Sequence, residues 1–199
     1  MIVRFMVSKI NWLLLTYKAP AEPAAKRIAV WRKLKAMGAV YLQNGVCLMP
    51  ETEDSLRRLQ MVENEIEGIG GEAVLLKTVG LNKAQEDKVV SRFSADRDEA
   101  YREFIDKCRD FEAEIAKETA AAHFTYAELE ENDEDLEKLK GWIEKIKKLD
   151  FYKAPLSQEA RARLEHCIGL LERYAKQVFE AHEENRAAEL SPDQEKGAR

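Results

Sequence analysis

The chain has 199 residues and a formal net charge of −5, with 45% hydrophobic and 35% charged residues. These fractions are typical of a soluble folded protein and exclude an intrinsically disordered one. No apolar run approaches the roughly 20 residues that a membrane span needs. The N-terminus, where Met1 and Met6 are alternative starts, has no signal-peptide pattern. We therefore expect a cytoplasmic protein with no membrane partner.

Charge and cysteine usage add two expectations. Residues 1–80 carry 11 Lys and Arg against 8 Asp and Glu, whereas residues 81–199 carry 21 against 29. A mildly basic front and an acidic back indicate two parts with different partners. Cys47, Cys108 and Cys167 are far apart and form no CxxC pair. This spacing favours buried thiols in a reducing compartment over disulfides or a zinc site.

The front of the chain is organised around Asn44-Gly45, which separates two short apolar runs within residues 39–50. Asn-Gly supplies the two positive φ angles of a type I′ turn, so the stretch predicts a β-hairpin. Trp12 to Tyr17 reads as a central strand buried on both faces, and Glu72 to Val79 reads as the last strand. An isolated hairpin is only marginally stable, so these strands should pair with it.

Two helices are predicted between these strands. The first runs from Ala24 to Met37 with an apolar face at helical spacing, and the second follows the cap at Thr52. The apolar positions are Ile28, Trp31 and Leu34 in the first helix and Leu56, Leu59, Val62 and Ile66 in the second. The order is strand, helix, strand, strand, helix, strand. We therefore expect an α+β fold: a ferredoxin-like βαββαβ antiparallel sheet over residues 11–80, with both helices on one face.

Residues 81–185 predict a helical extension. Asn82 and Ser94 are candidate N-caps for a short helix and then a long one. Thr125-x-x-Glu128 is a capping box for the next long helix, and Ser157 caps the last. These helices should form a bundle or pack against the open face of the sheet. The pattern fades after about residue 182, and residues 186–199 read as a disordered tail.

The sequence contains none of the common catalytic motifs, such as HExxH, GxSxG or a phosphate-binding loop. Adjacent helical residues such as His166 and Cys167 point about 100° apart, so they chelate one ion poorly. The carboxylate run over residues 128–135 is typical of a solvated helix start, where acids meet the helix dipole. We therefore expect no enzyme activity, no metal site and no cofactor.

Basic residues on the two front helices are the candidate binding site. They could face a phosphate backbone together, although lysines on amphipathic helices are often only solvated. The predicted nucleic-acid-binding residues are Lys26, Arg27, Arg32, Lys33, Arg57 and Arg58. The same set could attract a small dianion, but no defined oxyanion pocket can be recognised.

Two long stretches of the chain carry a resemblance to a known family. They read WLLLTYKAPAEPAAKRIAVWRKLKAMGAVYLQNGVCLMP and TYAELEENDEDLEKLKGWIEKIKKLDFYKAP. Together with the closing helix, they resemble the ChrB N-terminal domain family of chromate-resistance regulatory proteins over residues 11–180. The front also resembles the middle domain of PaaX-type transcriptional repressors, which is similar to the small ferredoxin-fold nucleases of CRISPR adaptation.

The resemblance implies a transcriptional regulator of chromate-resistance genes that acts through DNA. We expect the ferredoxin-like domain of such a regulator to pair as a homodimer through sheet edges or helices. Full-length regulators of this type carry a further C-terminal domain, so a separate sensor protein is an expected partner. The first alternative is a non-catalytic interaction module whose acidic helices dock that sensor.

A metal-dependent nuclease is the weaker alternative. The related nucleases place a metal-binding aspartate at the position of Lys18, and a protonated lysine cannot ligate Mg²⁺. A nuclease would therefore need Glu22 or another carboxylate in its place.

Overall fold

A computed structural model describes residues 10–189, so both candidate starts and residues 190–199 lie outside the described residues. The elements follow the predicted order of the front half and continue into three long helices. They are β1 (Asn11–Lys18), α1 (Ala24–Ala36), β2 (Val40–Gln43), β3 (Val46–Pro50), α2 (Glu53–Gly68), β4 (Glu72–Val79), α3 (Lys83–Ala120), α4 (Tyr126–Lys148) and α5 (Ser157–Glu189). The chain divides into two units. The sheet unit holds residues up to Asp98 together with Lys148–Pro155, and the helical unit holds the remainder.

The sheet has the strand order β2-β3-β1-β4, and every neighbouring pair is antiparallel. This order and the two helices between the strands confirm the ferredoxin-like α+β fold. β1 pairs with β4 along its whole length, from Asn11 opposite Val79 to Lys18 opposite Glu72. The Asn44-Gly45 turn joins β2 and β3, which confirms the hairpin, and Gly45 has a φ of +74°. The predicted turn type is wrong: Asn44 does not have the positive φ that a type I′ turn needs at both central residues. A positive φ at the second central residue alone is typical of a type II turn.

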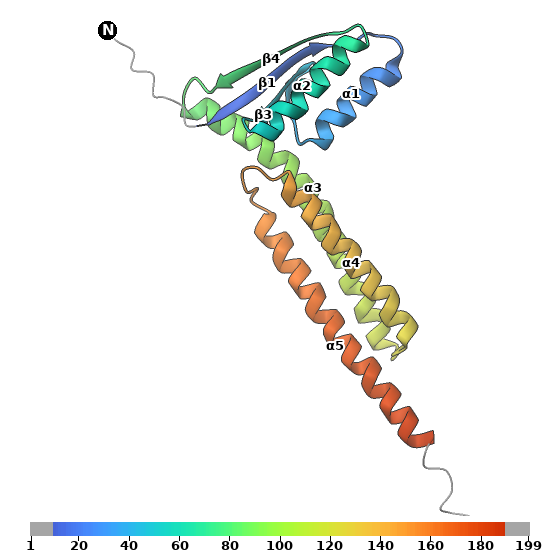
Figure 1. Cartoon of the computed structure of the whole chain (residues 1–199). Coiled ribbons are helices and arrows are strands. Elements are labelled where there is room, and N and C mark those ends of the chain that lie inside the picture. Colours follow the sequence, from blue (N-terminus) through green and yellow to red (C-terminus); the bar gives the residue numbers. More distant parts are fainter. Residues whose placement is uncertain (1–9, 190–199) are drawn as a thin grey trace, which may run out of the picture. The chain divides into compact units, whose positions relative to one another are not determined.

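The side chains of β1 point alternately to the two faces of the sheet, and both faces are buried there, as predicted. Leu13 and Leu15 join the core under α1 and α2, which lie on the same face (Figure 1). Trp12 faces the other way and packs with Val40, Leu48 and Phe93 of α3. The beginning of α3 therefore covers the face that the first two helices leave open, and the sheet is a central layer.

The apolar face predicted for α1 is wrong at two of its three residues. Val30 and Leu34 are buried, whereas Ile28 is 45% exposed and Trp31 is 48% exposed. Spacings of four and three residues follow the 3.6-residue period, and Val30, Leu34 and the buried Met37 have this spacing. Ile28, Trp31 and Leu34 are three residues apart each time, so they drift around the helix.

The helical extension differs from its prediction at one junction. Asn82 does cap a helix, because its side-chain oxygen accepts a hydrogen bond of 3.1 Å from the backbone N–H of Gln85. Ser94, however, is not a cap and lies inside the single continuous helix α3. α5 continues to Glu189, four residues into the segment expected to be disordered.

The three helices bury apolar seams against one another within the helical unit. α3 contributes Phe104 and Cys108, α4 contributes Leu136 and Ile143, and α5 contributes Cys167, Tyr174 and Val178. Arg163 of α5 bridges to Glu112 of α3 at 3.2 Å. All three cysteines of the chain are buried and form no disulfide, which confirms the prediction of buried thiols.

Candidate functional site

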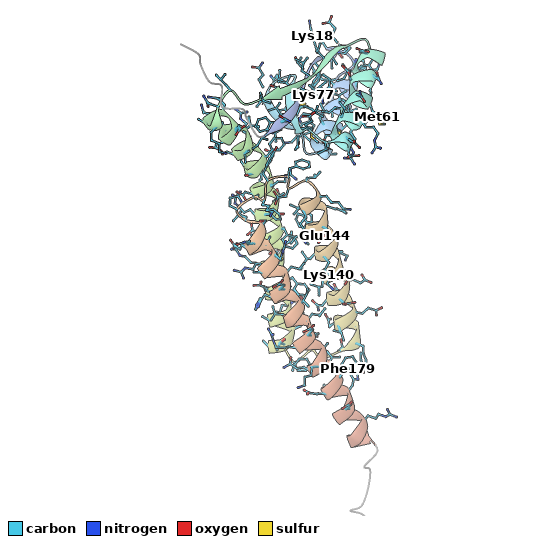
Figure 2. All side chains as sticks on the ribbon, turned by 60° about the vertical axis from the view of Figure 1, so that its left-hand side comes forward. Lys18, Met61, Lys77, Lys140, Glu144 and Phe179 are labelled. Carbon is cyan, nitrogen blue, oxygen red and sulfur yellow. The ribbon has the colours of Figure 1, made fainter. Side chains whose placement is uncertain are left out.

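A cleft of about 810 Å³ lies between the end of β1, one side of α1 and the β2–β3 hairpin. Its lining is basic and aromatic, and no carboxylate contributes to it. The lining residues are Tyr17, Lys18, Ala19, Arg27, Trp31, Lys35, Tyr41, Gln43, Asn44 and Gly45. Lys18, labelled in Figure 2, ends β1.

The helix α1 presents three of these residues as one stripe. Arg27, Trp31 and Lys35 are spaced four residues apart, so they lie above one another on one side of the helix. Burial of Val30 and Leu34 turns this side toward the hairpin. The half-exposed indole of Trp31 therefore stands between two cations. The sequence prediction missed this arrangement because it assigned Trp31 to the core.

The cations of the cleft differ in their partners. Lys35 donates to a carboxylate oxygen of Asp96 at 2.6 Å. Within the described part of the chain, neither Lys18 nor Arg27 forms an ion pair. A solvent-exposed cation without a carboxylate neighbour can bind an anionic ligand without first breaking an ion pair. Lys18 and Arg27 are thus the anchors that an incoming anion would meet first.

Two tyrosine hydroxyls add neutral donors to the lining. The oxygens of Tyr17 and Tyr41 are 2.8 Å apart. Burial raises the pKa of Tyr41, and the hydrogen bond to Tyr17 raises it further, so this hydroxyl stays protonated. Burial also raises the pKa of Tyr17. One hydroxyl hydrogen joins the two oxygens, and the other is left to donate to an acceptor in the cleft.

The hairpin turn is fixed to the end of β1 by backbone contacts. The N–H of Tyr17 donates to the carbonyl oxygen of Gly45 at 2.7 Å. A Cβ atom at position 45 would lie 2.4 Å from the carbonyl oxygen of Tyr17, closer than atoms can approach. Gly45 is therefore required both for its positive φ and for this close approach. The wall of the cleft is built from backbone at this point.

The structure separates the six predicted nucleic-acid-binding residues. Lys33 pairs with Glu65 of α2. Arg57 and Arg58 both pair with Asp54, at 2.6 and 2.9 Å. Lys26, Arg27 and Arg32 have no ion pair within residues 10–189, and among the six only Arg27 lines the cleft. Charge along the sequence located the cations, but their pairing depends on tertiary contacts.

The described residues contain no group of three or more His, Cys, Asp or Glu side chains arranged to hold a metal ion. Lys18 occupies the end of β1, and Glu22 does not line the cleft. No helix of the described part is long and apolar enough to cross a membrane.

The edges of the sheet are a second feature with functional potential. β4 has one neighbouring strand among the described strands, and Val74, Leu76 and Val79 are each about half exposed, at 51%, 50% and 56%. The opposite edge, β2, is occupied by Arg92, whose guanidinium donates to the carbonyl oxygens of Tyr41 at 2.9 Å and Leu42 at 3.2 Å. The two edges therefore differ in how open they are to another strand.

A third feature is an apolar groove of about 590 Å³ between α4 and α5, within the helical unit. Leu129, Leu136, Ile168 and Leu171 form its floor, and acidic residues such as Glu130 border it. Tyr126 and Phe179 are half exposed and lie with ring centroids 5.8 Å apart. Phe179 is labelled on α5 in Figure 2.

The protein is therefore an α+β protein in which a ferredoxin-like sheet with a basic cleft is followed by a long helical extension. A family model described as "Protein ChrB, N-terminal" matches residues 27–185. Protein ChrB of Cupriavidus metallidurans is 26% identical over 156 residues, which cover 77% of this chain and 44% of that protein. The chain belongs to the ChrB N-terminal family, and it spans less than half the length of this relative.

Proposed function

We propose that the protein is a cytoplasmic regulatory protein of the chromate-resistance type that acts by binding DNA. Family membership supports the regulatory class. One structural observation carries the DNA-binding step: Arg27, Arg32 and Lys26 stand on α1 without carboxylate partners in the described part of the chain. Phosphate contacts from such cations provide affinity and fix the protein on a duplex.

The position of the cations limits which surface DNA can use. The chain as a whole has a net charge of −5, and residues 81–199 hold the acidic excess. DNA should therefore approach the α1 side of the sheet unit, where like-charge repulsion is smallest. Lys33, Arg57 and Arg58 already hold carboxylates, so they should contribute less than Arg27 and Arg32.

A titration of fluorescent DNA from upstream of the protein's own operon tests the proposal, at two salt concentrations, with and without chromate. We expect binding that weakens with salt. The double variant R27E/R32E should lose binding. Its control, K145E/R161E, changes the charge by the same amount at exposed positions of the helical unit. Equal loss in both variants, or retained affinity in the first, would overturn the assignment.

We also propose that the protein forms a homodimer through the β4 edge. The exposed Val74 and Leu76 sit two residues apart, so they share one face of the sheet. A two-fold axis at Leu75, perpendicular to the sheet, sets Val74 of one copy opposite Leu76 of the other. The pairing is self-complementary: backbone groups join along the edge while four exposed apolar side chains cover one another.

We propose further that the protein is not a nuclease. The cleft at the end of β1, where the related nucleases hold their metal, has Lys18, Arg27 and Lys35 in its lining and no carboxylate. Cations repel Mg²⁺, which needs oxygen ligands. We expect no cleavage of linear or circular DNA with Mg²⁺ or Mn²⁺, and metal-dependent cleavage that E22Q abolishes would contradict this.

The groove between α4 and α5 favours a second candidate function, the docking of a separately encoded sensor. Half-exposed aromatic rings bordered by acids fit a helix with apolar and basic faces. The probe is the C-terminal part of the C. metallidurans relative, which this chain does not match, added as a separate polypeptide. Binding of this polypeptide, measured by calorimetry and weakened by F179S, would support docking. If the polypeptide does not bind, this candidate function is ruled out.

A further inference from the structure

The cleft beside α1 combines cations with an exposed aromatic ring, and the backbone of a DNA duplex does not need both. Cations and hydrogen-bond donors are sufficient to contact the phosphates of a duplex. The faces of its bases are stacked on one another, so they are not open to an aromatic side chain. Here a half-exposed indole, Trp31, lies between Arg27 and Lys35 on one stripe. An aromatic face flanked by cations is the arrangement by which proteins hold an unstacked base together with its phosphate.

We propose that the cleft binds a nucleotide whose base lies outside a stack. The base stacks on Trp31, and the phosphate meets Arg27 and Lys18, the two cations of the lining without an ion pair in the described chain. The Tyr17–Tyr41 pair supplies one further hydroxyl hydrogen for a phosphate or carbonyl oxygen. The inference rests on the proposed role in DNA binding, of which it specifies the recognised form.

The geometry of α1 supports this assignment of parts. Residues four apart on a helix are separated by about 6 Å along its axis, so Arg27 reaches the phosphate side of a nucleotide whose base covers Trp31. Lys35, one turn further on, is held by Asp96 at 2.6 Å, which leaves the opposite end of the stripe less cationic. The ligand is thereby oriented, with its anionic end toward Arg27 and Lys18.

The test measures the affinity of four probes: a 12-residue oligothymidylate, a random duplex of the same length, adenosine monophosphate and inorganic phosphate. The oligothymidylate should bind more tightly than the duplex and quench the emission of Trp31. The other two tryptophans should not respond, because Trp12 is buried and Trp142 of α4 does not line the cleft. W31A should weaken oligothymidylate binding roughly 5- to 100-fold, whereas W31F, which keeps a stacking face, should retain most of the affinity but lose the quench.

Matched variants separate stacking from surface and charge effects. I28A removes a similarly exposed apolar side chain from α1 outside the cleft, and K88Q removes an exposed charge of the sheet unit outside it. Both should bind oligothymidylate like the parent chain, whereas R27Q should bind weakly. Unchanged melting temperatures for W31A and R27Q would show that the fold is intact, since both side chains are exposed.

The outcomes separate this inference from the proposed function. If oligothymidylate binds and its binding depends on Trp31, the inference is supported and the bound nucleotide comes from DNA. If only adenosine monophosphate binds, again in dependence on Trp31, the inference is supported and the ligand is a free nucleotide. Duplex binding that W31A leaves unchanged, without preference for single strands, overturns the inference and keeps the proposed function. Binding of no probe, or of inorganic phosphate equally with the nucleotide, overturns the nucleotide site.

Discussion

The indole N–H of Trp12 donates a hydrogen bond of 2.8 Å to the hydroxyl of Tyr152, 140 residues later in the chain. Trp12 belongs to β1 and is 1% exposed, and Tyr152 belongs to the connection between α4 and α5. The ring of Tyr152 also packs against Phe93 of α3, with centroids 5.2 Å apart. The connection is therefore part of the core on the second face of the sheet.

We expect Y152F to destabilise the protein by about 1–3 kcal/mol, because the buried indole N–H of Trp12 would lose its acceptor. Urea denaturation followed by near-ultraviolet circular dichroism measures the change. Y126F is the control, since it removes a hydroxyl from a half-exposed ring of the helical unit. Equal stability of Y152F and the parent chain would show that water replaces the tyrosine hydroxyl.

Stability above pH 9 should depend on Cys47. Burial raises the pKa of this thiol to about 12, above the pKa of about 8.5 in an unfolded chain. Between these two values the folded state keeps a proton that the unfolded state has lost. The contribution of the thiol is therefore complete below pH 8 and falls by up to about 1.4 kcal/mol per pH unit above pH 9.

The variant C47A isolates this effect, because every other titrating group is common to both chains. At pH 7 we expect C47A to be roughly 1–2 kcal/mol less stable, from lost packing at a fully buried site. Urea denaturation at pH 7, 9 and 10 should show the gap between the two chains narrowing as the pH rises. A constant gap would contradict the raised pKa.

The β4 edge can be tested by the oligomeric state. V74E/L76E should dissociate the dimer, because four carboxylates would replace the apolar cluster at the proposed interface. M61E is the matched control: Met61 is 63% exposed on α2, and Figure 2 labels it away from Lys77 of β4. Sedimentation equilibrium measures the mass. A dimer that survives V74E/L76E, or that M61E dissociates equally, places the contact elsewhere.

The hairpin turn should tolerate no side chain at position 45. G45A forces a Cβ atom to within 2.4 Å of the Tyr17 carbonyl oxygen and places alanine at a φ of +74°. We expect a loss of roughly 1–3 kcal/mol in unfolding free energy, together with weaker ligand binding in the cleft. G68A is the control, since a Cβ atom there meets nothing within 4 Å. Equal effects of the two substitutions would show that the close approach is not rigid.

Local sequence signals predicted the sheet unit because they agree with one another. The Asn44-Gly45 turn set the hairpin, and alternation through Trp12 and Leu13 gave β1 two buried faces. Thr52 caps α2 as predicted, with its hydroxyl oxygen accepting from the N–H of Ser55 at 3.0 Å. Each of these features depends on a few neighbouring residues, which is why the sequence alone was sufficient.

The candidate site was only partly predictable, because it depends on tertiary contacts. Trp31 was assigned to the core by its spacing from Ile28 and Leu34, but the buried stripe through Val30 leaves it in the cleft. Lys33 was placed with the binding residues, yet Glu65 of α2 neutralises it, and no sequence spacing links positions 33 and 65. A search for stripes that alternate a cation with an aromatic residue at intervals of four would have singled out Arg27, Trp31 and Lys35.

The guanidinium of Arg92 limits how many copies of the chain can join through their sheet edges. A sheet with two open edges can add copies at both ends and grow into a fibre. With two β2 carbonyls already occupied by Arg92, the proposed pairing through β4 consumes the open edge of each copy. Growth then stops at two subunits. Arg92, which lies outside the proposed binding surfaces, limits the assembly to a dimer because it blocks the second sheet edge.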